Sequence, residues 1–227
     1  SECLVGSEMC IRDSIVIAYG EQANLYAELG MYDRALQLNT KAQHYSLLKD
    51  SFGLGDLYRY RAAIFGQTGI KDSIFYYLNQ AEKISALQGS FKGVFVNKVT
   101  TVEAYLDYTD SVQKALTLAL SICPDSSRMP QWAKYELELH LGRALLQTGK
   151  ATQGIPLIEK AAQGFISMDM RSGKQKANNI LMDYYLSMNM NDAFVRCYKR
   201  SQTFTDSLNL AEKMRAVAAA NIRFDTE

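Results

Sequence analysis

The sequence has few of the residues from which catalytic and metal sites are built. Only two histidines, His44 and His140, occur in 227 residues, and the four cysteines show no CxxC spacing. No HExxH motif, phosphate-binding glycine loop or GxSxG nucleophile motif is present. Because lone histidines and scattered thiols usually pack or face solvent, we expect no enzyme activity, no metal site and no cofactor.

Proline, net charge and long apolar runs are also scarce. Three prolines leave room for many uninterrupted helices. A formal net charge of +1 gives no basic face for a nucleic-acid backbone, so we expect no nucleic-acid contact by this chain. No apolar run approaches the roughly 18 residues that span a bilayer. A membrane would therefore be reached only through flanking segments.

The two ends of the sequence suggest a fragment of a longer protein. The chain starts without Met and stops at Glu227 without a glycine or proline stop signal. Near the start, Cys3 and Cys10 would lie roughly 10 Å apart on a continuous helix, which is beyond the reach of a disulfide. They would pair only if this segment is not helical. Cysteine usage leaves that pairing and the cellular compartment open.

A sequence repeat of about forty residues occurs five times along the chain. In its first copy the aromatic Tyr26 precedes Gly30, and the small residues Ala35 and Ala42 follow. A regular period in this range is typical of stacked helical hairpins. The corresponding turn positions in successive copies are Gly30, Gly69, Asp110, Gly149 and Asn189. Asparagine suits such a turn because it adopts left-handed geometry more easily than other non-glycine residues.

We therefore predict an all-α fold, a right-handed superhelical solenoid of about five hairpins, forming a single array over residues 1–227. Glycines 53, 93 and 173 are expected where the chain reverses between hairpins, and residues 123–130 are expected to form a longer loop bounded by prolines. The expected hairpins and the C-terminal helix are 16–53, 55–93, 96–123, 135–173, 175–204 and 206–224.

The C-terminal segment has a pattern of its own. Its apolar stripe follows a 4-3-4-3 spacing over fewer than three heptads, which is short for a coiled coil. We expect a capping helix that covers the open end of the array. Self-association through this helix is the alternative. The stripe consists of Leu210, Met214, Val217, Asn221 and Phe224.

The repeated residues resemble the tetratricopeptide-repeat family, whose repeats carry large, small, aromatic and glycine residues in a fixed order. The match in the first unit comprises Tyr19, Ala23, Tyr26, Gly30, Ala35 and Ala42. The period exceeds the family's usual 34 residues by about six, as in long-helix variants from regulatory and sensor proteins. The tail at 205–208 is similar to the region before the membrane span in repeat-containing sensor regulators of Bacteroidetes-type bacteria. That similarity implies an extracytoplasmic (periplasmic) sensing module.

The family resemblance implies that the first helix of each hairpin lines a concave groove for a protein or peptide. Asparagine and arginine side chains there can bond the main chain or carboxylates of an extended peptide. Asn24 matches one position of the family's carboxylate clamp, but Gly20 replaces the paired lysine, so a chaperone C-terminus is not the expected ligand. The candidate groove residues are Asn24, Glu28, Arg59, Gln67, Asn97, Tyr108, Arg143, Gln147, Lys176, Asn179 and Asp183.

These patterns favour a non-catalytic protein- or peptide-binding module, the sensor or scaffold part of a longer signalling or transcription-regulating protein. One alternative is a cytoplasmic peptide-responsive regulator domain. Another is a structural assembly protein that oligomerises through its convex face or its C-terminal helix. We also expect Tyr198 in the core, and one exposed contact residue in each of the pairs at 76–77 and 184–185.

Overall fold

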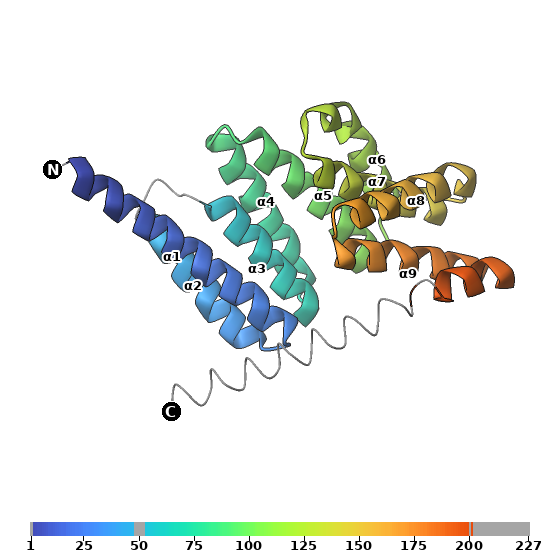
Figure 1. The fold of residues 1–227 in the computed structure, drawn as a ribbon, viewed down its shortest axis with the longest axis horizontal. Helices are drawn as coiled ribbons and strands as arrows, with labels where there is room; N and C mark the ends of the chain where they lie inside the picture. The colour runs from blue at the N-terminus through green and yellow to red at the C-terminus, as the bar shows by residue number, and fades with distance from the viewer. Residues whose placement is uncertain (1, 48–52, 200, 202–227) are drawn as a thin grey trace. The chain divides into compact units, whose positions relative to one another are not determined.

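The computed structural model describes residues 2–47, 53–199 and 201, with side chains from residue 13 onward. All regular structure in these ranges is helical, which confirms the predicted fold class (Figure 1). Two compact units divide the chain, Ser1–Leu118 and Ala119–Glu227. The predicted C-terminal helix at 206–224 and its apolar stripe lie outside the described residues.

The first unit contains two complete hairpins and the first helix of a third. Each helix packs against the next, and the first helices of successive hairpins also contact one another, α1 with α3 and α3 with α5. A disulfide between Cys3 and Cys10 was expected only if this segment is not helical. Both positions lie within α1, so this disulfide is not expected. The helices are α1 (Glu2–Glu28), α2 (Tyr32–Leu47), α3 (Leu54–Thr68), α4 (Lys71–Leu87) and α5 (Phe91–Tyr108).

The second unit starts within α6, the second helix of the third hairpin, and continues through the fourth and fifth hairpins. Helix α8 packs against both α7 and α9, and α7 also contacts α9. The last described helical residues are 191–199 and 201. The elements are α6 (Val112–Ile122), the 3-10 helix η1 (Cys123–Arg128), α7 (Gln131–Gln147), α8 (Ala151–Ser167) and α9 (Arg171–Ser187).

Residues 123–130, predicted to be a loop, are mostly helical. Pro124 lies in the first turn of η1, where a missing amide proton costs no hydrogen bond. Pro130 then precedes α7 in an extended conformation. The prolines therefore begin two helices here, and the expectation of an irregular loop was wrong.

The turns within hairpins form largely where the repeat predicts them. Gly30, Gly69 and Gly149 have φ angles of 73°, 76° and 78°, and Asn189 has 56°. These left-handed conformations end the first helix of each hairpin. In the third hairpin Asp110 does not adopt this geometry, and the neighbouring Thr109 is extended instead.

Two predicted junction glycines have a different role. Gly53 does turn the chain before α3, with a φ of 67°. Gly93 and Gly173, however, lie inside the first turns of α5 and α9. The chain reverses earlier, at Gly89 and Asp169, with φ angles of 66° and 53°. A side chain at Gly93 would clash with Ser85 on α4, and one at Gly173 would clash with Phe165 on α8. Glycine at these positions therefore lets α5 and α9 pack closely against the preceding helices.

Small residues bring the two helices of a hairpin together, as the repeat predicts. A Cβ atom on Gly154 would lie 2.6 Å from the carbonyl oxygen of Gly142, and one on Gly142 would lie 2.8 Å from that of Gly154. The main chains of α7 and α8 are therefore in contact at this point. Elsewhere alanines occupy the equivalent buried positions, including Ala23, Ala35, Ala62 and Ala115.

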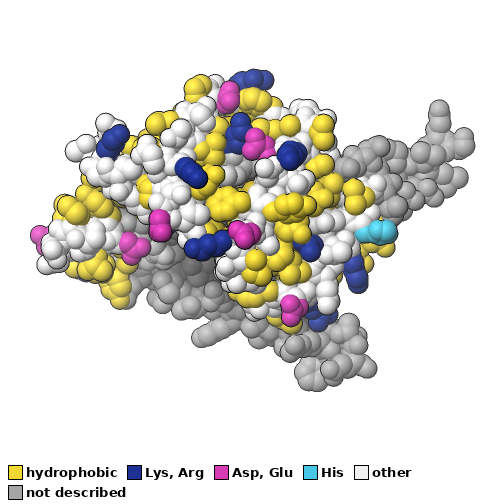
Figure 2. Space-filling model, turned by 180° about the vertical axis from the view of Figure 1, so that it is seen from behind, with side chains coloured by type: hydrophobic (Ala, Val, Ile, Leu, Met, Phe, Trp, Pro, Cys, Tyr) yellow, Lys and Arg dark blue, Asp and Glu magenta, His cyan; other side chains and the backbone are white. Residues whose placement is uncertain are grey.

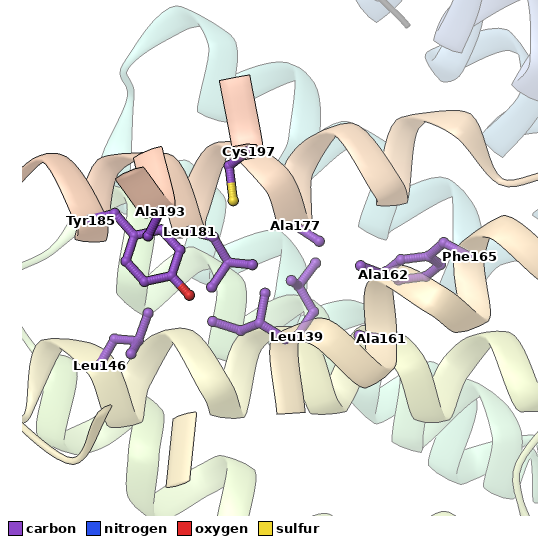
Figure 3. Close-up of a cluster of buried hydrophobic side chains, with 11 residues drawn as sticks. Leu139, Leu146, Ala161, Ala162, Phe165, Ala177, Leu181, Tyr185, Ala193 and Cys197 are labelled. Carbon is purple, nitrogen blue, oxygen red and sulfur yellow. The ribbon is translucent and has the colours of Figure 1, made fainter. Parts of the chain in front are cut away.

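Larger side chains fill the space beside these contacts. In the second unit Phe165 and Leu181 are almost fully buried between α8 and α9 (Figure 3). Leu139 joins them from α7, and Cys197 from the last described helical segment. This cluster fixes which face of α9 is turned inward.

Gly154→Ala should lower the free energy of unfolding by about 1–3 kcal/mol, because the new methyl group overlaps main-chain atoms that cannot move aside. Urea denaturation measures this loss. Gln153→Ala, at the neighbouring exposed position, is the control and should change stability by less than about 0.5 kcal/mol. A Gly154→Ala protein as stable as the control would contradict the close approach of α7 and α8.

Candidate functional site

The candidate groove residues lie on the first helices of the hairpins. In the first unit these are α1, α3 and α5, and in the second unit α7 and α9. The first unit carries Asn24, Glu28, Arg59, Gln67, Asn97 and Tyr108, and the second carries Arg143, Gln147, Lys176, Asn179 and Asp183.

Arg59 on α3 is held by two neighbouring side chains. Its Nη2 donates to Oδ1 of Asp56 at 2.9 Å, and its guanidinium lies 4.7 Å from the ring centroid of Tyr60. The side chain is 22% exposed, and its buried Nε has no hydrogen-bond partner among the described residues. A guanidinium that is oriented on two sides and partly exposed is suited to bind an acceptor oxygen.

Gln67 and Tyr108 lie near the C-terminal ends of two first helices of the first unit. Gln67 is exposed near the end of α3, and the partly buried Tyr108 ends α5. The phenol of Tyr108 lies directly against Gly66, where any side chain would clash with it. Gly66 therefore brings the end of α5 next to α3. On α1, Asn24 is half-buried and Glu28 is exposed.

Asn97 is not part of an accessible surface. It is 1% exposed, and its Nδ2 donates to the Oγ of Ser85 on α4 at 3.0 Å. Ser85 also faces Gly93, where a Cβ atom would lie 2.8 Å from the hydroxyl oxygen. The small residues draw α5 against α4 and enclose Asn97, so its assignment as a groove residue was wrong. The serine twelve positions earlier was the signal that sequence reasoning missed.

The second unit's candidates are mostly exposed. Gln147, Lys176 and Asp183 face solvent, and Arg143 is half-buried. Asn179 is exposed, but its Oδ1 accepts a hydrogen bond from Nε2 of Gln175 at 3.1 Å. The same Nε2 lies 2.8 Å from the Oγ of Ser201. Through Gln175, Asn179 is thus linked by hydrogen bonds to Ser201 on the second helix of the same hairpin.

Solved structures with the same arrangement of helices are tetratricopeptide-repeat proteins. One is a signal transduction ATPase with numerous domains (STAND) carrying a tetratricopeptide repeat sensor, from Pyrococcus horikoshii, with a TM-score of 0.63 and 14% identity. Two others are structures of Podosopora anserina putative kinesin light chain nearly identical TPR-like repeats, with TM-scores of 0.58 and 0.57 and identities of 14% and 13%. The chain has the tetratricopeptide-repeat fold.

The extent of these matches differs. They cover 87%, 87% and 86% of this chain. The chain spans 30% of the STAND protein and 97% of each kinesin light chain structure. No family model and no curated protein matches the sequence. At these identities the likeness establishes the fold alone.

Aromatic residues of this tetratricopeptide-repeat fold mostly fill the space between helices. Tyr77 stacks on Phe65 at 5.4 Å between centroids, whereas Tyr76 is 58% exposed, so one member of that pair is exposed as predicted. Tyr185 is buried and Tyr184 is half-buried. The predicted core position of Tyr198 was wrong, since it is 44% exposed.

The thiol of Cys123 in the second unit is not an activated nucleophile. Burial raises the pKa of the Cys123 thiol, and the nearby Glu138 carboxylate raises it further. Both effects favour the protonated thiol, which is a poor nucleophile. His140 is almost fully buried, with its Nε2 3.5 Å from Oε2 of Glu136, whereas His44 is exposed.

Across residues 2–47, 53–199 and 201, no three His, Cys, Asp or Glu side chains gather where they could hold a metal ion. None of the described helices combines the length and the apolar character needed to cross a membrane.

Asn97→Ala should lower the free energy of unfolding by about 1–3 kcal/mol, because it leaves the buried Ser85 hydroxyl without its partner. Urea denaturation of Asn97→Ala, Ser85→Ala and the double variant measures the coupling between the two residues. The double variant should lose less stability than the two single variants together. Strictly additive losses would contradict the hydrogen bond between Asn97 and Ser85.

Proposed function

We propose that this chain is a non-catalytic module that binds a protein or peptide, as the sensor or scaffold part of a longer signalling or transcription-regulating protein. The ligand contacts the exposed side chains of the first helices. In the first unit the contact centres on Arg59 and extends along α3 toward Gln67 and Tyr108.

The arrangement of Arg59 is the observation that carries this proposal. Asp56 and Tyr60 hold the guanidinium in place, so little side-chain freedom remains to be lost when a ligand binds. The guanidinium, whose side chain is 22% exposed, can donate to the carbonyl oxygen of a peptide main chain or to a carboxylate. Arginine and tyrosine are also the residue types that dominate the energy of protein interfaces.

The distribution of charge agrees with a ligand of mixed character. On the face seen in Figure 2, Lys and Arg side chains are interspersed with Asp and Glu, and neither sign gathers into a patch. A formal net charge of +1 for the whole chain points the same way. A strongly acidic or strongly basic partner is therefore not favoured.

A sensor role is supported by one of the structural neighbours. The tetratricopeptide repeats of the Pyrococcus horikoshii STAND protein are described as its sensor. We extend this role to the present chain because repeats of this fold expose a row of first-helix side chains without a catalytic centre. Signalling in the longer protein would then follow from ligand binding to these helices.

Arg59→Ala should weaken binding of a peptide selected by this chain at least about tenfold, which corresponds to about 1.4 kcal/mol. A phage-displayed peptide library screened against the whole chain supplies the peptide, and isothermal titration calorimetry gives the Kd. Lys83→Ala, at an exposed position of the second helix α4, is the matched control and should leave the Kd unchanged.

Arg59→Lys separates charge from geometry in the same experiment. Lysine keeps the positive charge but lacks the planar set of donors, so binding should remain weakened. Thermal denaturation followed by circular dichroism shows whether each variant is folded. The proposal fails if folded Arg59→Ala binds the peptide as tightly as the wild type, or if Lys83→Ala weakens binding equally.

A further inference from the structure

A small pocket opens between α8 and α9 in the second unit. Its volume of about 130 Å³ is several times what one water molecule needs by the same measure, about 10–15 Å³. Ala162 and Leu181, which belong to the buried cluster of Figure 3, form part of its wall. Ile166, 42% exposed, extends this apolar wall toward solvent.

A residue with an unpartnered polar group also lines this pocket. Asn178 lines the pocket and is 1% exposed, and its buried Nδ2 has no hydrogen-bond partner among the described residues. A buried amide without an acceptor costs free energy, so nearly all such groups in proteins are paired. Asn178 therefore marks a position where an acceptor oxygen is expected.

The chain contains a second copy of this helix pair, with different residues at the equivalent positions. Helices α4 and α8 begin 80 residues apart, at Lys71 and Ala151. Helices α5 and α9 also begin 80 residues apart, at Phe91 and Arg171. At the same step Glu82 corresponds to Ala162 and Lys98 corresponds to Asn178.

In the first unit these two positions hold an ion pair. The Nζ of Lys98 lies 3.8 Å from Oε1 of Glu82. In the second unit the alanine at 162 removes the carboxylate that would face residue 178. The pocket and the unpaired amide therefore result from two particular substitutions between copies of one repeat.

We propose that this pocket binds an aliphatic residue of a peptide. The main-chain carbonyl oxygen of that residue accepts from Nδ2 of Asn178, and its side chain lies against Ile166 and Leu181. Lys174 and Glu159 line the same pocket, so charges of both signs flank the main chain of the bound residue. A lining with both a positive and a negative side chain suits the dipolar peptide unit better than it suits a ligand of one charge.

The pocket is separate from the candidate groove surface of the same helix. At about 100° per residue along an α-helix, Asn178 and Leu181 lie roughly opposite the groove candidates Lys176 and Asp183. The two surfaces can therefore be occupied independently. The pocket does not rest on the function proposed for Arg59.

The test uses N-acetyl-leucine-N-methylamide as a probe, added to the whole 15N-labelled chain. Chemical shifts of the Asn178 side-chain amide report binding and yield a Kd. The corresponding glycine derivative lacks the aliphatic group and should bind at least about fivefold more weakly, since apolar contact adds to affinity.

Ala162→Glu combined with Asn178→Lys transplants the ion pair of the first unit and should close the pocket. We expect at least a tenfold rise in the Kd of the leucine probe, measured by backbone amide shifts around the pocket. Gln153→Ala, at an exposed position of the same helix outside the pocket, is the control and should leave the Kd unchanged.

Ile166→Ser provides a second variant if the transplanted pair disturbs folding, because Ile166 is partly exposed and lies at the edge of the core. It should raise the Kd for the leucine probe but not for the glycine derivative. The proposal is overturned if the probe leaves the Asn178 amide unshifted, which would indicate a pocket filled by water only. Equal Kd values for the two probes, or for the wild type and the folded double variant, would also overturn it.

Discussion

The helices α7 and α8 touch through their main chains where Gly142 and Gly154 meet. The carbonyl oxygens of Gly142 and Gly154 leave no room for a Cβ atom on the opposite helix. Contact at one such point fixes both the distance and the rotation of the two helices. Every larger side chain must then either fit beside the contact, as Phe165 does, or point into solvent. Which residues reach a ligand is thus decided largely by the positions of the small ones.

Helix pairs at equivalent places in the repeat nevertheless differ in their surface residues. At positions related by 80 residues, Glu82 and Lys98 close the surface of one pair, whereas Ala162 and Asn178 leave a pocket in the other. Gly93 and Gly173 lie at equivalent positions beneath them, and each brings its helix close to a side chain of the preceding helix, Ser85 in one pair and Phe165 in the other. A repeat architecture therefore allows surface positions to change while the packing beneath them is kept.

The sequence alone predicts the hairpins well, because turns and small residues have distinctive types. Gly30 and Asn189 were identified as turns since few residues adopt left-handed geometry. Gly93 could not be interpreted correctly, because a glycine needed for close packing looks the same as one needed for a turn. The prediction that Asn97 lines the groove was wrong for a related reason. A polar residue on a helix suggests an exposed position until its buried partner, here Ser85, is placed opposite it.

The most direct test of this account is a nuclear Overhauser measurement on the 15N- and 13C-labelled chain. A Cβ atom on Gly154 would lie 3.1 Å from the amide nitrogen of Leu146 on the facing helix. An α-proton of Gly154 points along that direction, so a strong cross-peak to the amide proton of Leu146 is predicted. Absence of this cross-peak, with both resonances assigned, would contradict main-chain contact between α7 and α8 and the account built on it.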